Sequence, residues 1–310
     1  MASPDPTLPP ESTLTSLLTR AESLLARLEQ VLPSPHQSPV MAPDWSASVA
    51  FRYRKRTSAA WATGWLEPVR HVGQIGYEDL KEVDVQKERF ARNLAQFVAG
   101  RTANNVLLSG ARGTGKSSLV KAGLQAHAAQ GLRLIEVDKA DMIDLPDLIE
   151  LVCQRPERFI VYCDDLSFDE GEPGYKALKS ILDGTVSASG ENILLVATSN
   201  RRHLLPEYHS DNKTYTRGAE GELHPGEAVE EKISLSERFG LWISFYPFSQ
   251  DEYLAIVAQW LQHFGLPAGV MARARPESLV WSLERGSRSG RVAYQFARDF
   301  AGREQAGGRA

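Results

Sequence analysis

The sequence predicts an α/β fold built on a parallel sheet, followed by a small helical domain at the C-terminal end. Short apolar runs of strand length indicate buried strands. The first four runs are separated by helix-like stretches, and strands that alternate with helices form βαβ units with a parallel sheet. The runs are NNVLLS (104–109), LRLIEV (132–137), FIVYC (159–163), NILLVAT (192–198) and LWISFY (241–246).

Amphipathic stretches predict the helices. A helix over residues 85–98 would place Phe90, Leu94 and Phe97 on one face. No strand-like run follows residue 248. We therefore expect an α/β core, a helical lid and a disordered tail, over residues 86–248, 249–304 and 305–310. Two further helices are predicted within SSLVKAGLQAHAAQ (117–130) and GYKALKSILDG (174–184).

Composition indicates an ordinary soluble globular protein. The chain has 310 residues, of which 42% are hydrophobic and 24% are charged, and its net charge is -4. That charge excludes a general basic field for nucleic acid but leaves room for a local basic patch. Cys153 and Cys163 lie in apolar segments without a CxxC pair, which favours a reducing compartment. No signal peptide or spanning helix is visible, so we expect a cytoplasmic protein.

The N-terminal region is expected to be a helical arm with a linker, over residues 1–45. Leucines from Leu14 to Leu32 recur at alternating spacings of four and three, as in a heptad seam, and prolines follow in 33–43. Because the seam is short, packing on the protein itself is favoured over a coiled coil. Residues 46–85 would form an extension leading into the core. Its run FRYRKR (51–56) either contacts phosphates or an acidic partner, or is a solvated face, which we favour.

The segment GARGTGKS (110–117) matches the phosphate-loop pattern GxxxxGK[ST] in full. It follows a predicted strand and precedes a predicted helix, which disfavours the alternative of a plain glycine-rich turn. Glycines let backbone N–H groups point at phosphates, and the helix N-terminus adds partial positive charge. Lys116 would reach the β- and γ-phosphates, and Ser117 would bind Mg²⁺. The predicted phosphate-binding residues are Gly110, Ala111, Arg112, Gly113, Thr114, Gly115, Lys116, Ser117 and Ser118.

Two acids end the third predicted strand, FIVYCDD (159–165). In a phosphate-loop sheet this is the Walker B position, where Asp164 would hold Mg²⁺ and Asp165 would polarise the attacking water. Many ATPases of this class have Asp-Glu here. Asp165 is one methylene shorter, so slow hydrolysis and a nucleotide switch both remain compatible with the sequence.

A polar residue at the end of the next strand would reach the same site. Asn200 is the first candidate to hydrogen-bond the water or the γ-phosphate, and Thr198 is the second. The alternative is a helix cap for RRHLL (201–205).

Together, the phosphate loop, the Walker B strand, the polar strand end and the C-terminal helical region resemble the AAA+ superfamily. LSERFG (235–240) is similar to the segment that carries the arginine finger, so Arg238 would reach the γ-phosphate of a neighbouring subunit. The alternative is a surface arginine paired with Glu237 or Glu231. GSRSGR (286–291) is similar to the sensor-2 segment, with Arg291 as first choice, Arg288 as second, and a solvated helix end as the alternative.

The sequence more closely resembles a bacterial family of AAA+ ATP-binding proteins described as domain of unknown function 815. The resemblance runs from about Val69 to the C-terminus. It implies the AAA+ fold and ATP binding, but no substrate. By this resemblance Leu80 and Val83 would pack against the adenine. The motifs that carry it are RPERFIVYCDDLSFDE, ATSNRRHLLPE, HPGEAVEEKISLSERFG and FYPFSQDEYLAIV.

The expected function is Mg²⁺-dependent ATP hydrolysis that drives remodelling or loading of an unidentified protein or nucleic-acid partner by a homo-oligomer, with an AAA+ ring as the usual form. Two alternatives stay open: a slow or non-hydrolysing nucleotide-dependent switch or adaptor, and a nucleic-acid-binding loader that uses FRYRKR and the lid. The polar insertion over 206–232 is expected to be a solvated loop in preference to a metal site. The possible ligands there are His209, Asp211, His224, Glu227, Glu230 and Glu231.

Overall fold

The computed structural model describes residues 19–23, 40–57, 62–168, 172–183, 191–201, 216–217, 223–224 and 237–307. Residues 19–23 are helical, and the rest of the predicted heptad helix lies outside the described residues. The same is true of most of the predicted 206–232 insertion, where β8 (Thr216–Arg217) and β9 (Leu223–His224) form a small antiparallel pair.

The core is an eight-stranded sheet in the order β1-β3-β2-β5-β6-β7-β4-β10. All five predicted strands are present, and each pair of neighbours among them is parallel. The phosphate-loop strand lies between β7 and β10, and the Walker B strand lies on the far side of β7. The predicted parallel α/β fold is thus confirmed. These strands are β4 (Val106–Gly110), β5 (Leu132–Glu136), β6 (Arg158–Cys163), β7 (Ile193–Ser199) and β10 (Leu241–Phe245).

Two strands from the predicted N-terminal extension, and one from the end of the predicted linker, enlarge this sheet. β2 (Ala50–Thr57) pairs parallel with β5 and antiparallel with β3 (Ala62–Pro68), and β1 (Val40–Met41) completes the edge. The segment is therefore part of the core sheet. Phe51 and Tyr53 are buried, whereas the alternating residues Arg52 and Arg54 are half-buried and exposed, which is the two-residue alternation of a half-buried strand.

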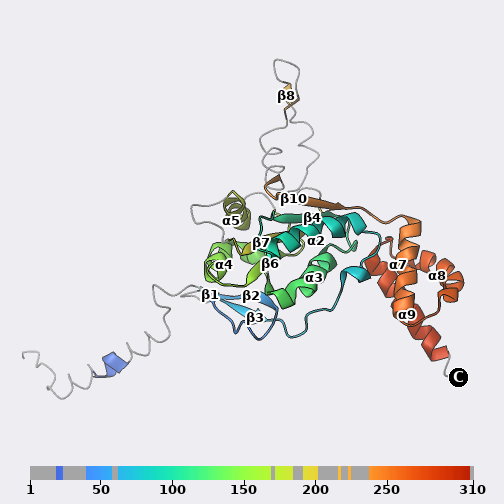
Figure 1. Ribbon diagram of the computed structural model, residues 1–310, viewed down its shortest axis with the longest axis horizontal. Helices are drawn as coiled ribbons and strands as arrows, with labels where there is room; N and C mark the ends of the chain where they lie inside the picture. The colour runs from blue at the N-terminus through green and yellow to red at the C-terminus, as the bar shows by residue number, and fades with distance from the viewer. Residues whose placement is uncertain are drawn as a thin grey trace, which may run out of the picture.

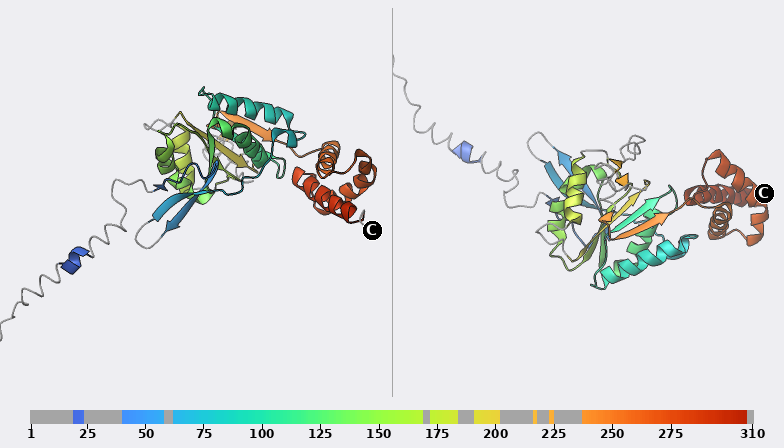
Figure 2. Two further views of the ribbon diagram at one scale, coloured as in Figure 1. Left: turned by 60° about the horizontal axis from the view of Figure 1, so that its bottom comes forward. Right: turned by 90° about the horizontal axis from the view of Figure 1, so that it is seen from above.

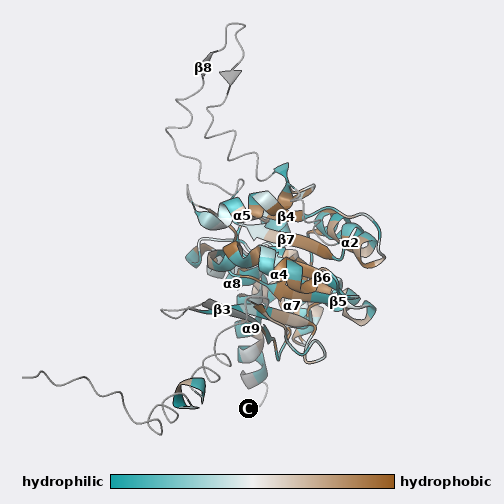
Figure 3. Cartoon of the chain, turned by 90° about the vertical axis from the view of Figure 1, so that its left-hand side faces the viewer, coloured by the Kyte–Doolittle hydropathy of each residue, from teal (hydrophilic) through white to brown (hydrophobic). Residues whose placement is uncertain are grey.

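Helices cover both faces of the sheet, and neighbouring residues of one strand serve different cores (Figures 1 and 3). Leu108 belongs to the cluster formed with α2 (Asp84–Val98) and α3 (Lys116–His127), whereas Leu107 belongs to the opposite cluster. Both leucines are fully buried, and burial of each such side chain contributes about 1.5–3 kcal/mol to the free energy of folding. The opposite face packs against η3 (Lys139–Asp144), α4 (Leu145–Val152) and α5 (Pro173–Leu182).

The C-terminal region consists of α7 (Gln250–His263), α8 (Met271–Glu284) and α9 (Gly290–Gly307). It lies beside the sheet, at the end of the molecule away from β1–β3 (Figure 2). α7 begins with a reciprocal cap, in which Ser249 Oγ accepts from Glu252 N and Glu252 Oε2 accepts from Ser249 N. α9 continues three residues past the predicted boundary at 304, so residues 305–307 of the expected tail are helical.

Short 3₁₀ helices occupy three connections: η1 (Tyr77–Asp79), η2 (Ala128–Gln130) and η5 (Ala268–Val270). None of the helices in the described ranges has both the length and the apolar character needed to span a bilayer.

Candidate functional site

The predicted phosphate loop joins β4 to α3 and is wrapped tightly by its glycines. Gly110, Gly113 and Gly115 all have positive φ, at 124°, 71° and 99°, which glycine adopts most easily. A Cβ on Gly110 would collide with the carbonyl oxygen of Phe245 in the neighbouring strand. The loop is therefore held against β10, and the Ala111 N–H donates to the same carbonyl at 3.1 Å.

Lys116 lies at the start of α3 and is almost fully buried. Its ammonium donates to the carbonyl oxygens of Gly110 (2.9 Å) and Ala111 (2.7 Å) and to Asn200 Oδ1 (3.0 Å). Burial lowers the pKa of Lys116, and the nearby Asp165 carboxylate partly offsets this shift. The three bonds place the ammonium inside the loop, where a phosphate bound by the loop would meet it.

Asp164 collects three hydroxyl donors on one carboxylate oxygen. Ser117 Oγ (2.7 Å), Tyr162 OH (2.7 Å) and Thr198 Oγ1 (2.5 Å) all donate to Asp164 Oδ1. Burial alone would raise the pKa of Asp164, but hydrogen bonds led by the one from Thr198 outweigh it, and the pKa is lowered. The two residues predicted to hold Mg²⁺ thus lie side by side, with an ionised carboxylate next to a hydroxyl. Such oxygen ligands suit that ion.

Asp165 connects to the phosphate loop through Asn200. Asn200 Nδ2 donates to Asp165 Oδ1 at 2.6 Å, while its Oδ1 accepts from Lys116. Asp165 has a positive φ of 52°, a left-handed conformation that is uncommon outside glycine but tolerated by aspartate. The predicted strand-end residue therefore bridges the lysine and the second acid. The hydroxyl of Thr198, the second candidate, instead donates to Asp164 Oδ1 and accepts from the Asp165 N–H.

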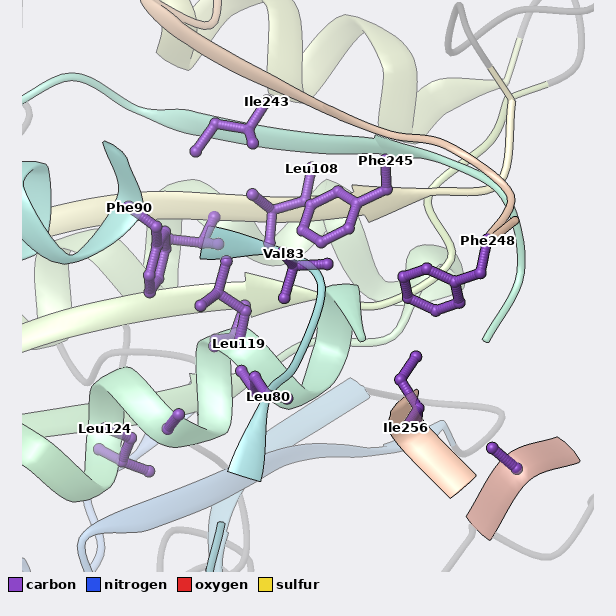
Figure 4. Packing of buried hydrophobic residues seen from close by; sticks show 14 of the residues in the cluster. Leu80, Val83, Phe90, Leu108, Leu119, Leu124, Ile243, Phe245, Phe248 and Ile256 are labelled. Carbon is purple, nitrogen blue, oxygen red and sulfur yellow. The ribbon is translucent and has the colours of Figure 1, made fainter. Parts of the chain in front are cut away.

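A cleft of about 720 Å³ contains these groups, which is within the usual size range for small-molecule sites. Leu80 and Val83 line it, as do Arg291 and all the predicted loop residues from Arg112 to Ser118. Figure 4 shows that its apolar wall continues the hydrophobic core, with Leu80 next to α3 and Phe248 facing Ile256. Sequence reasoning missed the apolar and aromatic residues contributed by the C-terminal helices: Ile256, Trp260 and Tyr294.

The α9 N-terminus rests directly on the phosphate loop. Gly290 N donates to Gly113 O at 2.8 Å, and a Cβ on Gly113 would approach the Ser289 side chain to 2.9 Å. Arg291, the first residue after this contact, faces the cleft, whereas Arg288 lines an adjacent cavity of about 560 Å³. Arg291 is thus the predicted sensor-2 candidate that the fold brings to the loop.

The first prediction concerns this contact. Gly113→Ala should destabilise the fold by roughly 1–3 kcal/mol, because alanine must adopt a positive φ and displace Ser289. It should also weaken binding of a fluorescent ATP analogue. Thermal unfolding and a fluorescence titration measure the two effects. Gly73→Ala is the control, since no atom lies within 4 Å of a Cβ there. Equal behaviour of the two variants would contradict the role given to the contact.

Arg238 lies apart from the cleft. It precedes β10, whose first residue pairs with the first residue of β4, while Phe245 at its other end pairs with Gly110 of the loop. A five-residue strand spans about 17 Å, so Arg238 lies at the opposite edge of the sheet from its own phosphate loop. Its guanidinium forms an ion pair with Asp183, just after α5. Of the two acids predicted as alternative partners, Glu231 lies outside the described residues.

Comparison with known proteins identifies the family. A family model described as "Protein of unknown function (DUF815)" matches residues 46–304, most of the chain. This protein belongs to that family. The match confirms the resemblance seen in the motifs and starts earlier than the expected Val69, so β2 and β3 are family elements. No curated protein matches the sequence.

Several solved structures are similar to the chain over most of its length. A RuvB mutant from Thermotoga maritima has 13% identity and a TM-score of 0.47, covering 73% of this chain and 64% of its own. The FIGL-1 AAA domain in complex with ADP has 17% identity, a TM-score of 0.48 and 74% coverage of each chain. ORC1 from Aeropyrum pernix in complex with DNA has 16% identity, a TM-score of 0.49 and coverages of 77% and 63%. This chain thus spans less than two thirds of the RuvB chain.

Proposed function

We propose that this protein binds ATP with Mg²⁺ in the cleft beside the C-terminal helices and hydrolyses it. The observation that carries the proposal is the pair of hydrogen-bond chains at the carboxyl edge of the sheet. One chain joins Ser117 to Asp164, and the other joins Lys116 to Asp165 through Asn200. Lysine, hydroxyl, metal-binding acid and second acid thus meet at one glycine-rich loop, as phosphoryl transfer from a nucleotide requires.

Each group has a distinct task in this proposal. The loop N–H groups and Lys116 would bind the phosphates, and Leu80, Val83 and Trp260 would provide the apolar surface for the base. Ser117 and Asp164 would hold Mg²⁺, which when bound neutralises phosphate charge. Asp165 would orient and polarise the attacking water, and Asn200 would hold that carboxylate in place. Arg291 would contact the phosphates from α9.

The second prediction tests the acid–base role. Asp165→Asn should lower kcat by about 10²–10⁴-fold while ATP affinity changes little, because the Asp165 carboxylate bonds Asn200 and, within the described residues, no atom of the loop. Steady-state Mg²⁺-ATPase assays and an ATP titration separate these quantities. Glu136→Gln, in β5 and bonded to Arg52, is a control acid outside the cleft. Unchanged turnover in Asp165→Asn would remove this residue from the mechanism.

We further propose that Arg238 acts in a second copy of the chain. Its place at the far edge of the sheet keeps it from its own cleft, and its ion pair with Asp183 is partly exposed, with side-chain exposures of 26% and 45%. Partly exposed ion pairs contribute about 1 kcal/mol or less, so the guanidinium can exchange this partner for a phosphate at little cost. The functional unit would then be a homo-oligomer, with a ring as one form.

The output we propose is remodelling or loading of a macromolecular partner through nucleotide-dependent movement of the C-terminal helices. The direct contact between Gly290 and Gly113 supports this, because a change at the phosphates reaches α9 through one hydrogen bond. One observation favours a second candidate, a slow nucleotide-dependent switch. The Asp165 side chain is one methylene shorter than that of glutamate, and its carboxylate already accepts a hydrogen bond from Asn200 at 2.6 Å. Turnover would require that bond to rearrange.

The loader interpretation has less support from the structure. Arg52, Arg54 and Lys55 of β2 form ion pairs with Glu136, Glu67 and Asp144, respectively. The basic run therefore has acids beside it and offers little net positive charge to a phosphate backbone. A reducing location such as the cytoplasm suits the two cysteines, which are both free thiols.

A further inference from the structure

Thr198 makes contacts to three consecutive residues after β6. Its hydroxyl donates to Asp164 Oδ1 at 2.5 Å and accepts from the Asp165 N–H at 2.9 Å. Its backbone carbonyl accepts from the Leu166 N–H at 2.7 Å. Thr198 is 1% exposed, so water does not compete for these bonds. One residue of the neighbouring strand thus fixes the turn that carries both acids.

The turn needs such support because Asp165 is in the left-handed region, with φ of 52°. A non-glycine residue keeps this conformation only where its surroundings hold it. The bond from the Asp165 N–H to Thr198 and the following bond from Leu166 act on either side of the Asp165 Cα. In that conformation the Asp165 carboxylate reaches Asn200, and through it the lysine of the phosphate loop.

Resting on the function proposed above, we infer that Thr198 is a positioning residue: its hydroxyl orients the metal-binding acid and the water-polarising acid together. A hydroxyl that donates to one acid and accepts from the backbone of the next fixes their relative position. Valine has nearly the same shape but can neither donate nor accept. Serine keeps the hydroxyl.

The test compares Thr198→Val, Thr198→Ser and a matched control, Ser199→Ala. Ser199 is fully buried and is the next residue of β7, and within the part of the chain that the structure describes its hydroxyl bonds only Arg201 N. We expect Thr198→Val to lower kcat by about 10²-fold, as misplacement of a reacting group by about 1 Å does, with the KM for ATP little changed. Thr198→Ser should recover most of the turnover, and Ser199→Ala should keep it.

A second readout does not depend on turnover. Affinity for a fluorescent ATP analogue, measured with and without Mg²⁺, gives the gain that Mg²⁺ provides. We expect Thr198→Val to reduce that gain and Thr198→Ser to retain it. If wild type neither binds nor hydrolyses ATP, the proposed function itself is wrong. Suppose that Mg²⁺ increases the affinity of wild type for ATP. If Thr198→Val then retains both this increase in affinity and the wild-type kcat, the inference about Thr198 is overturned.

Discussion

In the Lys116→Ala variant we expect ATP turnover to fall by about 10²–10³-fold, the usual cost of losing one preorganised donor to the reacting group. Lys116 is the only lysine that contacts the loop carbonyls among the described residues, and it also holds Asn200. ATP affinity should fall too, because the buried ammonium is the positive charge inside the loop. Steady-state ATPase assays and an ATP titration measure both losses.

The control for this variant is Lys176→Ala, since Lys176 is an exposed residue of α5 outside the cleft. It should retain wild-type turnover and affinity. A thermal unfolding scan separates loss of function from loss of fold, because Lys116→Ala also removes two bonds to the loop backbone. Full activity in a folded Lys116→Ala protein would rule out the phosphate-loop assignment.

The Arg238→Ala variant should lose turnover by about 10³-fold or more and should keep the wild-type affinity for ATP. This separation of kcat from affinity follows from the place of Arg238 at the edge of the sheet away from its own loop. Arg101→Ala, which removes an exposed arginine after α2, serves as the control for loss of a surface cation. A loss of ATP affinity in Arg238→Ala, or normal turnover, would contradict a role for Arg238 in a neighbouring site.

The sheet and the grouping of the candidate site residues at one edge of it were predictable from the sequence for a physical reason. Buried parallel strands must be almost wholly apolar, so β4, β6 and β7 stand out as uninterrupted runs. The candidate acids and Asn200 follow those strands directly in the chain. Since the carboxyl ends of parallel strands meet at one edge of a sheet, the order of these residues in the chain is enough to predict that they lie close together.

The features that sequence reasoning missed depend on how distant elements pack. β2 has a basic-aromatic sequence because arginines on its outer face alternate with Phe51, Tyr53 and Lys55. Lys55 pairs with Asp144, to which Tyr53 also donates. The alternation of Phe51 and Tyr53 was the available signal of a half-buried strand. Trp260 and Tyr294 are on different helices and meet at 4.9 Å between ring centroids, next to the cleft. Their positions depend on how α7 and α9 pack against each other and on the contact of α9 with Gly113, which local pattern does not encode.

The backbone conformation of the two acids after β6 could not be predicted from the sequence either. The motif indicates which carboxylates are candidates to bind the metal and the water, but the left-handed backbone of Asp165 and its support by Thr198 arise only when β7 lies beside β6. A strand-end threonine looks the same in sequence whether it faces a ligand or a neighbouring turn. The structure resolves this ambiguity by burying Thr198 against the acids.

We propose that ATP is hydrolysed at a site completed by a second copy of the chain. Turnover in a mixture of two inactive variants tests this most directly. Arg238→Ala has an intact phosphate loop, and Lys116→Ala has an intact Arg238. We predict that each alone is inactive and that mixing them restores activity, increasing with total protein concentration. If the mixture stays inactive at concentrations where wild type hydrolyses ATP, Arg238 does not complete a neighbouring site.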